Sequence, residues 1–119
     1  MLFPFLIKWG LILPNPGEAM HNLDITYSAL GRHQDALAMG EKTLEFRRRV
    51  LPENHPDIGI SCSNLGISCR NVGDLNRALQ FAREALRIFQ ATLPPSHPRV
   101  TQAQQLVLRY EGDISARRS

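Results

Sequence analysis

The feature that most constrains this chain is an internal repeat with a period of 42 residues. Between the pairs 22/64 and 63/105, eleven of 42 positions are identical when the sequence is shifted by that period. The identical pairs are Asn22/Asn64, Leu23/Leu65, Ile25/Ile67, Gly31/Gly73, Ala36/Ala78, Leu37/Leu79, Leu44/Leu86, Leu51/Leu93, Pro52/Pro94, His55/His97 and Pro56/Pro98. Self-similarity of this kind indicates a repeat architecture, in which each unit buries its apolar face against its neighbours.

Each repeat is predicted to be a pair of helices. In the second repeat, Pro56 suits a first helical turn, because its missing N–H is no loss there. Gly73 then stops the helix, since glycine adopts the left-handed conformation without a steric cost. One face of this helix carries small and apolar residues at i, i+3, i+4 and i+7, namely Cys62, Leu65, Gly66 and Cys69. A second helix is expected from about Asp74 to Pro94, lined by Leu75, Ala78, Leu79, Ala82, Ala85, Leu86 and Phe89.

The first repeat has the same layout. Leu23 and Tyr27 are expected to face inward on its first helix, and Gly31 to turn the chain. The second helix is expected to be lined by Ala36, Leu37, Gly40 and Leu44. A fifth helix is predicted over about 98–110, followed by a frayed tail at 111–119.

These residues resemble the tetratricopeptide (TPR) family, in the 42-residue variety found in kinesin light chains. The family pattern of apolar, small and turn positions is met in the second repeat by Leu65, Gly66, Cys69, Gly73, Leu75, Ala78, Ala82 and Ala85. In the first repeat the same positions hold Leu23, Asp24, Tyr27, Gly31, His33, Ala36, Gly40 and Thr43. The connections 51–56 and 93–98 also look like the linker of the kinesin-light-chain type.

The resemblance implies an all-α fold, a right-handed α-solenoid of antiparallel helix pairs. The repeat domain is expected over residues 17–110, with repeats at about 22–63 and 64–105 and a capping helix at about 98–110. Roughly three repeats are usually needed for stability, so two repeats and a cap lie near the lower limit. Self-association, or a contribution from the N-terminal segment, could complete the core.

The N-terminal segment 1–16 differs in character from the rest. Met1–Leu13 is apolar except for Lys8 and Gly10. A secretory signal would place its basic residues before the apolar core, whereas the only lysine here interrupts it. We therefore favour a packing segment, or a start that cuts into a longer protein.

Helix geometry divides the first helix of each repeat into a packed arc and an open arc. The resemblance implies that the open arc lines a concave groove that binds a peptide segment. The residues proposed for this groove are Asn22, Ile25, Ser28, Asn64, Ile67, Arg70, Asn71 and Arg109. In similar arrays, an asparagine at the position of Asn22 and Asn64 holds peptide backbone, because an amide donates and accepts at once.

Arg70 and Arg109 would favour acidic side chains or a carboxylate in the partner. The plainer interpretation is that these arginines and asparagines are solvated surface groups. His55 and His97 recur once per linker, which favours capping of the next helix over metal binding. The basic run 47–49 is interpreted as a solvated helix face.

The predicted function is a protein-interaction scaffold that binds a peptide of a partner. The alternative is a repeat segment of a larger signalling or immune-receptor-like protein, acting in sensing or oligomerisation. We expect no catalytic set, cofactor, metal, small-molecule substrate, nucleic acid or membrane as part of the function. The net charge of +3 is too small to imply a nucleic-acid partner. Cys62 and Cys69 lie about 10 Å apart along one helix, too far for a disulfide, which suits a cytoplasmic protein.

Overall fold

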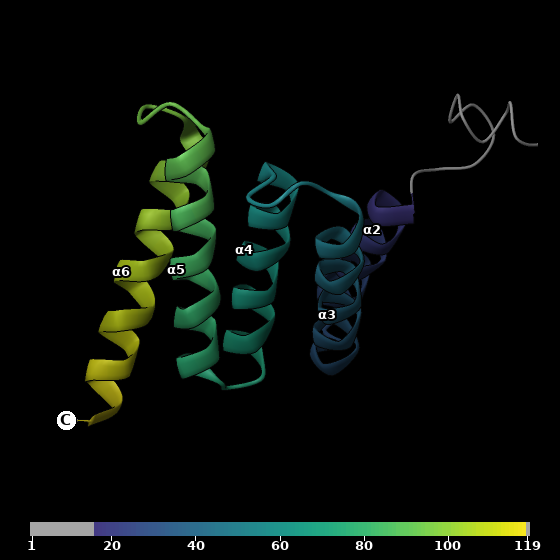
Figure 1. The fold of residues 1–119 in the computed structure, drawn as a ribbon. Coiled ribbons are helices and arrows are strands. Elements are labelled where there is room, and N and C mark those ends of the chain that lie inside the picture. Colours follow the sequence, from purple (N-terminus) through teal and green to yellow (C-terminus); the bar gives the residue numbers. More distant parts are fainter. Residues whose placement is uncertain (1–15, 119) are drawn as a thin grey trace, which may run out of the picture.

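The computed structural model describes residues 16–118, and all of its regular structure is helical. The helices are α2 (Pro16–Ala29), α3 (His33–Val50), α4 (Pro56–Asn71), α5 (Leu75–Thr92) and α6 (Pro98–Arg118). Each helix packs against the next one along the chain, and together they form a row (Figure 1). The predicted all-α repeat fold is therefore confirmed for this part of the chain.

The two repeats turn at equivalent glycines. Gly31 and Gly73 have φ angles of +76° and +90°, in the left-handed region that favours glycine. The linkers are equivalent as well. His55 Nδ1 accepts a hydrogen bond from the Asp57 backbone N–H at 3.0 Å, and His97 Nδ1 accepts one from the Arg99 N–H at 3.1 Å. The expectation that these histidines cap the helices that follow is confirmed.

The core lies along α5, between α4 and α6. The small residues Ala78, Ala82 and Ala85 of α5 are fully buried, which lets its neighbours approach closely. At Gly66 of α4, an added Cβ would lie 3.2 Å from the backbone oxygen of Ala78. The core around α5 contains the buried residues Leu44, Ile58, Cys62, Leu65, Cys69, Ile88, Phe89, Val100, Ala103 and Tyr110.

The structure corrects two expectations. Leu23 does not face inward, because its side chain is 38% exposed, and Asp24 is buried beside it instead. The fifth helix does not end near Tyr110 but continues to Arg118, so residues 111–118 are helical. Contacts with earlier helices hold this extension: Glu111 pairs with Arg83 at 3.1 Å, and Arg117 donates to the Gly73 backbone oxygen at 3.3 Å.

The apolar segment 1–15 lies outside the described residues. Within residues 16–118, no helix is both long and apolar enough to cross a membrane.

Candidate functional site

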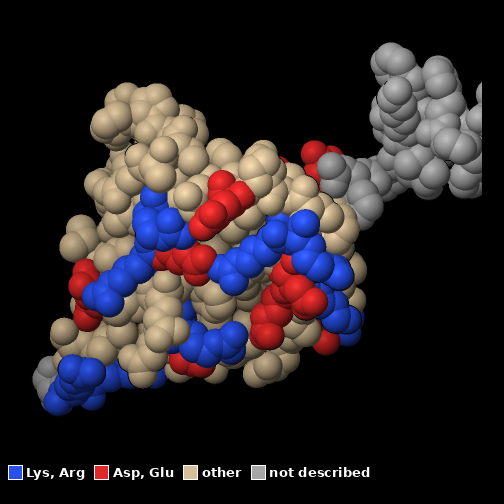
Figure 2. Space-filling view, viewed as in Figure 1, with Lys and Arg blue, Asp and Glu red and all other residues tan. Residues whose placement is uncertain are grey.

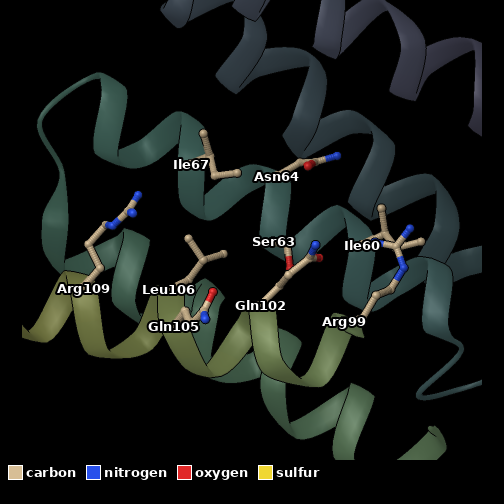
Figure 3. Close-up of a pocket in the computed structure, with 9 residues that line it drawn as sticks. All are labelled: Ile60, Ser63, Asn64, Ile67, Arg99, Gln102, Gln105, Leu106 and Arg109. Atoms are coloured by element: carbon tan, nitrogen blue, oxygen red, sulfur yellow. The ribbon is translucent and has the colours of Figure 1, made fainter. Parts of the chain in front are cut away.

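A groove of about 290 Å³ lies between α4 and α6, the first helices of two successive helix pairs (Figure 3). It is partly open to solvent, so it can admit side chains of a ligand. Its lining residues are Ile60, Ser63, Asn64, Ile67, Arg99, Gln102, Gln105, Leu106 and Arg109. Three of the residues proposed from the sequence, Asn64, Ile67 and Arg109, therefore come together here.

The α4 wall follows from the packing of that helix. Cys62, Leu65, Gly66, Ser68 and Cys69 are buried, so Asn64 and Ile67 lie on the other arc of the helix. Asn64 and Ile67 project from this outer arc into the groove (Figure 3). Ile67 is 40% exposed, which makes it an apolar contact available to a ligand.

The α6 wall is one stripe of the helix surface. Arg99, Gln102, Leu106 and Arg109 follow one another at intervals of three, four and three residues, which places them on one face. On the adjacent face of α6, Tyr110 is 1% exposed and packs on α5. The two arginines stand at opposite ends of the groove, with the amide groups between them (Figure 3).

Arg99 and Arg109 are the two arginines that line the groove. Within the described residues, neither guanidinium forms an ion pair, whereas Arg48, Arg77 and Arg83 pair with glutamates of neighbouring helices. An unpaired guanidinium keeps its planar set of donors for an external acceptor. The groove therefore offers positive charge at both ends and amide groups with two apolar side chains in its middle.

Asn64 is held by the neighbouring repeat. Its Nδ2 lies 3.0 Å from His21 Nδ1 on α2. An amide nitrogen can only donate, so with the amide in this orientation His21 Nδ1 accepts, which requires a neutral imidazole. Burial and the nearby charges of Arg47 and Arg99 lower the pKa of His21, which favours that neutral form. The contact leaves the amide oxygen of Asn64 available to a peptide N–H.

The other proposed residues lie apart from this groove. Arg70 and Asn71 line a neighbouring hollow toward the C-terminal end of α6, where Arg70 Nε lies 3.5 Å from Asp113 Oδ2. Arg70 is therefore partly neutralised by a carboxylate of its own chain.

The three α2 residues do not line the groove either. Asn22 and Ile25 are exposed on α2, and Ser28 is half-buried there.

The sequence interpretation missed Arg99 and Gln102, which line the groove beside Asn64. The 42-residue shift hides them, because it aligns them with Asp57 and Ile60, which have different chemistry. The signal that could have found them is helical spacing within α6. Counting back from Arg109 in steps of three and four residues leads to both.

In the basic run 47–49, Arg48 and Arg49 are exposed as the sequence suggested, but Arg47 is not. Arg47 is buried at 6% exposure, and its guanidinium donates to Ser61 Oγ at 2.9 Å. Arg48 is bonded to Glu84, so within this run Arg49 is the exposed arginine that forms no ion pair among the described residues. On the face seen in Figure 2, basic and acidic side chains are interleaved.

The two thiols have no reactive character. Cys62 and Cys69 are free and buried, and burial raises the pKa of Cys62 to about 12. A thiol with that pKa stays protonated and behaves as a small apolar group. Among residues 16–118, no three His, Cys, Asp or Glu side chains gather closely enough to hold a metal ion.

Comparisons with known proteins agree with this architecture. The sequence profile of the tetratricopeptide repeat family matches residues 14–91. Two crystal structures of nearly identical TPR-like repeats, from a Podosopora anserina protein described as a kinesin light chain, have a similar fold. One has a TM-score of 0.76 at 21% identity over 86% of this chain, and the other, of a single-residue variant, has a TM-score of 0.75 at 21% identity over 83%. The chain spans 49% and 47% of the lengths of these two structures, and no curated protein matches it.

Proposed function

Because the chain belongs to the tetratricopeptide repeat family, whose members are generally protein-interaction scaffolds, we propose that it binds a peptide segment of a partner protein in the groove between α4 and α6. The observation that carries the proposal is the pair of unpaired arginines, Arg99 and Arg109, at the two ends of a groove lined by amides. The preferred segment is acidic, since guanidinium groups form charge-assisted hydrogen bonds with carboxylates.

The spacing of the arginines predicts the spacing of the acidic side chains. Ten residues of helix separate Arg99 from Arg109, which corresponds to about 15 Å along α6. An extended peptide advances by about 3.3 Å per residue. Two acidic side chains separated by four or five residues would therefore reach both guanidinium groups at once.

The middle of the groove suits the rest of such a peptide. The amides of Asn64, Gln102 and Gln105 can donate to and accept from the peptide backbone. Ile67 and Leu106 offer an apolar contact between the two charged ends. We propose no catalytic role, because these groups supply neither a nucleophile nor a general base. A scaffold of this kind, with reduced thiols, would act in the cytoplasm.

The test is binding of the purified chain to arrays of synthetic twelve-residue peptides in acidic, neutral and basic sets. The acidic set is expected to bind, with the strongest signals from peptides whose acidic residues stand four or five apart. Affinities of selected peptides are then measured by fluorescence anisotropy. Arg99→Glu and Arg109→Glu should each weaken binding about fivefold or more, since an exposed charged contact is worth about 1 kcal/mol.

Arg49→Glu is the matched control, because it changes the net charge equally at an exposed arginine of α3. Binding should decrease in the two groove variants and stay nearly unchanged in the control. If all three variants lose affinity equally, the interaction depends on net charge alone and the groove assignment is wrong. Binding that none of the three affects would also refute it.

A further inference from the structure

The first helices of the successive pairs, α2, α4 and α6, carry an equivalent row of residues. In α4 and α6 this row faces the preceding helix. In α4 the row is Ser61, Leu65 and Ser68, with exposures of 3%, 0% and 2%. Two contacts show that it packs on α3. Ser61 accepts a hydrogen bond from Arg47, and an added Cβ at Gly40 would lie 3.0 Å from Leu65 Cδ2.

The same row is covered in α6, where its middle member is half-buried and the other two are buried. Shifted by 42 residues, its members are Ala103, Val107 and Tyr110. Ala103 and Tyr110 are each 1% exposed, and Val107 packs on the same core cluster as Tyr110. These clusters include Ala78, Ala82 and Ala85 of α5, so in both cases the preceding helix covers the row.

The equivalent row of α2 is open. It comprises Ala19, Leu23 and Thr26, and it continues to Leu30 in the turn after the helix. All four are exposed, Leu23 at 38% and Leu30 at 66%. The equivalent of Leu23 is buried in α4 (Leu65) and half-buried in α6 (Val107), and the equivalent of Leu30 after α4 (Val72) is half-buried. Two exposed leucines in line on α2 therefore indicate that a further apolar segment belongs against this face.

The chain itself supplies a segment of suitable chemistry immediately before α2. Residues 2–13 are apolar except for Lys8 and Gly10, and Leu13-Pro14-Asn15-Pro16 leads into the helix. That connection is a version, two residues shorter, of the linkers at 51–56 and 93–98, which also begin with Leu-Pro and end with Pro. Each of those linkers follows the helix that covers the row of the next helix.

The lengths agree as well. From Ala19 to Leu30 the row spans eleven residues, or about 16 Å along the helix axis. A helical segment of twelve residues is about 18 Å long. Pro4 is compatible with the first turn of such a segment.

We propose that residues 2–13 cover the open row of α2, in the place that a second helix of a preceding repeat would take. The contact buries the apolar side chains of the segment together with Leu23 and Leu30. The segment takes this place from within the chain, without a second copy.

Trp9 makes the proposal directly testable, because it is the only tryptophan of the chain and lies in the segment. In the unmodified chain, the fluorescence of Trp9 is expected to be shifted to the blue of free tryptophan and to be shielded from acrylamide. Leu23→Asp and Leu30→Asp should shift the emission to the red and raise the quenching constant toward that of the urea-unfolded chain. Leu30 lies outside the helix, so its variant remains informative if Leu23→Asp reduces the helix content measured by circular dichroism.

Leu108→Asp is the matched control, since Leu108 is 69% exposed at the opposite end of the array. It should leave the emission of Trp9 unchanged. The proposal would be overturned if Trp9 is exposed to quencher in the unmodified chain. It would also be overturned if neither α2 variant changes the exposure of Trp9, or if Leu108→Asp increases that exposure as much as they do. Shielding that disappears on dilution together with a dimer, seen by sedimentation, would assign the face to a second copy instead.

Discussion

Replacing Asp24 by asparagine is expected to remove a pH dependence from the stability of the first repeat. The carboxyl group is 4% exposed between α2 and α3, and its Oδ1 has no hydrogen-bond partner among the described residues. Burial disfavours the charged form and raises the pKa of Asp24 to about 6. In the second repeat the equivalent position is Gly66, which has no side chain to ionise.

The size of the effect follows from the difference between the folded and unfolded states. The pKa of Asp24 rises from its ordinary value of 3.8 to about 6 on folding. Because the folded pKa is the higher one, the protonated carboxyl stabilises the fold at low pH, and this stabilisation is lost as the pH rises through about 6. At 1.36 kcal/mol per pKa unit, the loss between about pH 4 and about pH 7.5 amounts to roughly 2–3 kcal/mol.

The assay is urea unfolding of both proteins, followed by circular dichroism at several pH values in this range. The stability of Asp24→Asn relative to the unmodified chain should rise by about 2–3 kcal/mol from low to high pH. His21 has a lowered pKa and therefore destabilises the fold as the pH falls, but it titrates in both proteins and cancels in the difference. Asp35→Asn serves as the control, because Asp35 is exposed and paired with Arg32 at 2.7 Å.

The control should differ from the unmodified chain by less than about 0.5 kcal/mol at every pH. A relative stability of Asp24→Asn that stays constant with pH would show that the carboxyl titrates normally, and the proposed burial would then be wrong. A change of the opposite sign would mean that the carboxylate has a favourable partner in the folded state.

Two further predictions concern packing and capping. Gly59→Ala should destabilise the fold by about 1–3 kcal/mol, because the new Cβ would lie 2.6 Å from Cε1 of the buried Phe89. Gly112→Ala should instead stabilise α6 by about 0.5–1 kcal/mol, because the space around its Cβ is open. Thermal unfolding of the pair checks this, and equal effects would contradict it. His55→Ala should lower the free energy of unfolding by about 1 kcal/mol, because it removes the acceptor of the Asp57 N–H. His55→Asn should retain most of the stability, since an asparagine side chain can also cap the helix. Equal losses of stability in the two variants would exclude capping as the cause.

The sequence was sufficient for the parts of the fold that depend on local chemistry. Gly31 and Gly73 marked the two turns because each adopts a positive φ angle that disfavours other residues. The small and apolar spacing around Leu65 predicted which face of α4 is buried, and thereby placed Asn64 and Ile67 on the open face. Half of the groove was therefore predictable from a single helix.

The remainder depends on contacts between helices that periodicity does not encode. Leu23 has the same place in its repeat as Leu65, but it is 38% exposed whereas Leu65 is fully buried. Arg47 belongs to a basic run, yet Ser61 lies within hydrogen-bond distance and the side chain is buried. The extension of α6 past Gly112 is held by contacts with α5 and with the turn before it.

Binding of an acidic peptide in the groove between α4 and α6 can be observed residue by residue by nuclear magnetic resonance. The measurement is a titration of the ¹⁵N-labelled chain with the tightest acidic peptide from the array. We expect the side-chain amide signals of Asn64, Gln102 and Gln105, which line the groove, to shift. Those of Gln34 and Gln90, on α3 and α5, should stay unchanged. Shifts confined to Gln34 and Gln90, or saturable binding that leaves the groove amides unmoved, would contradict it.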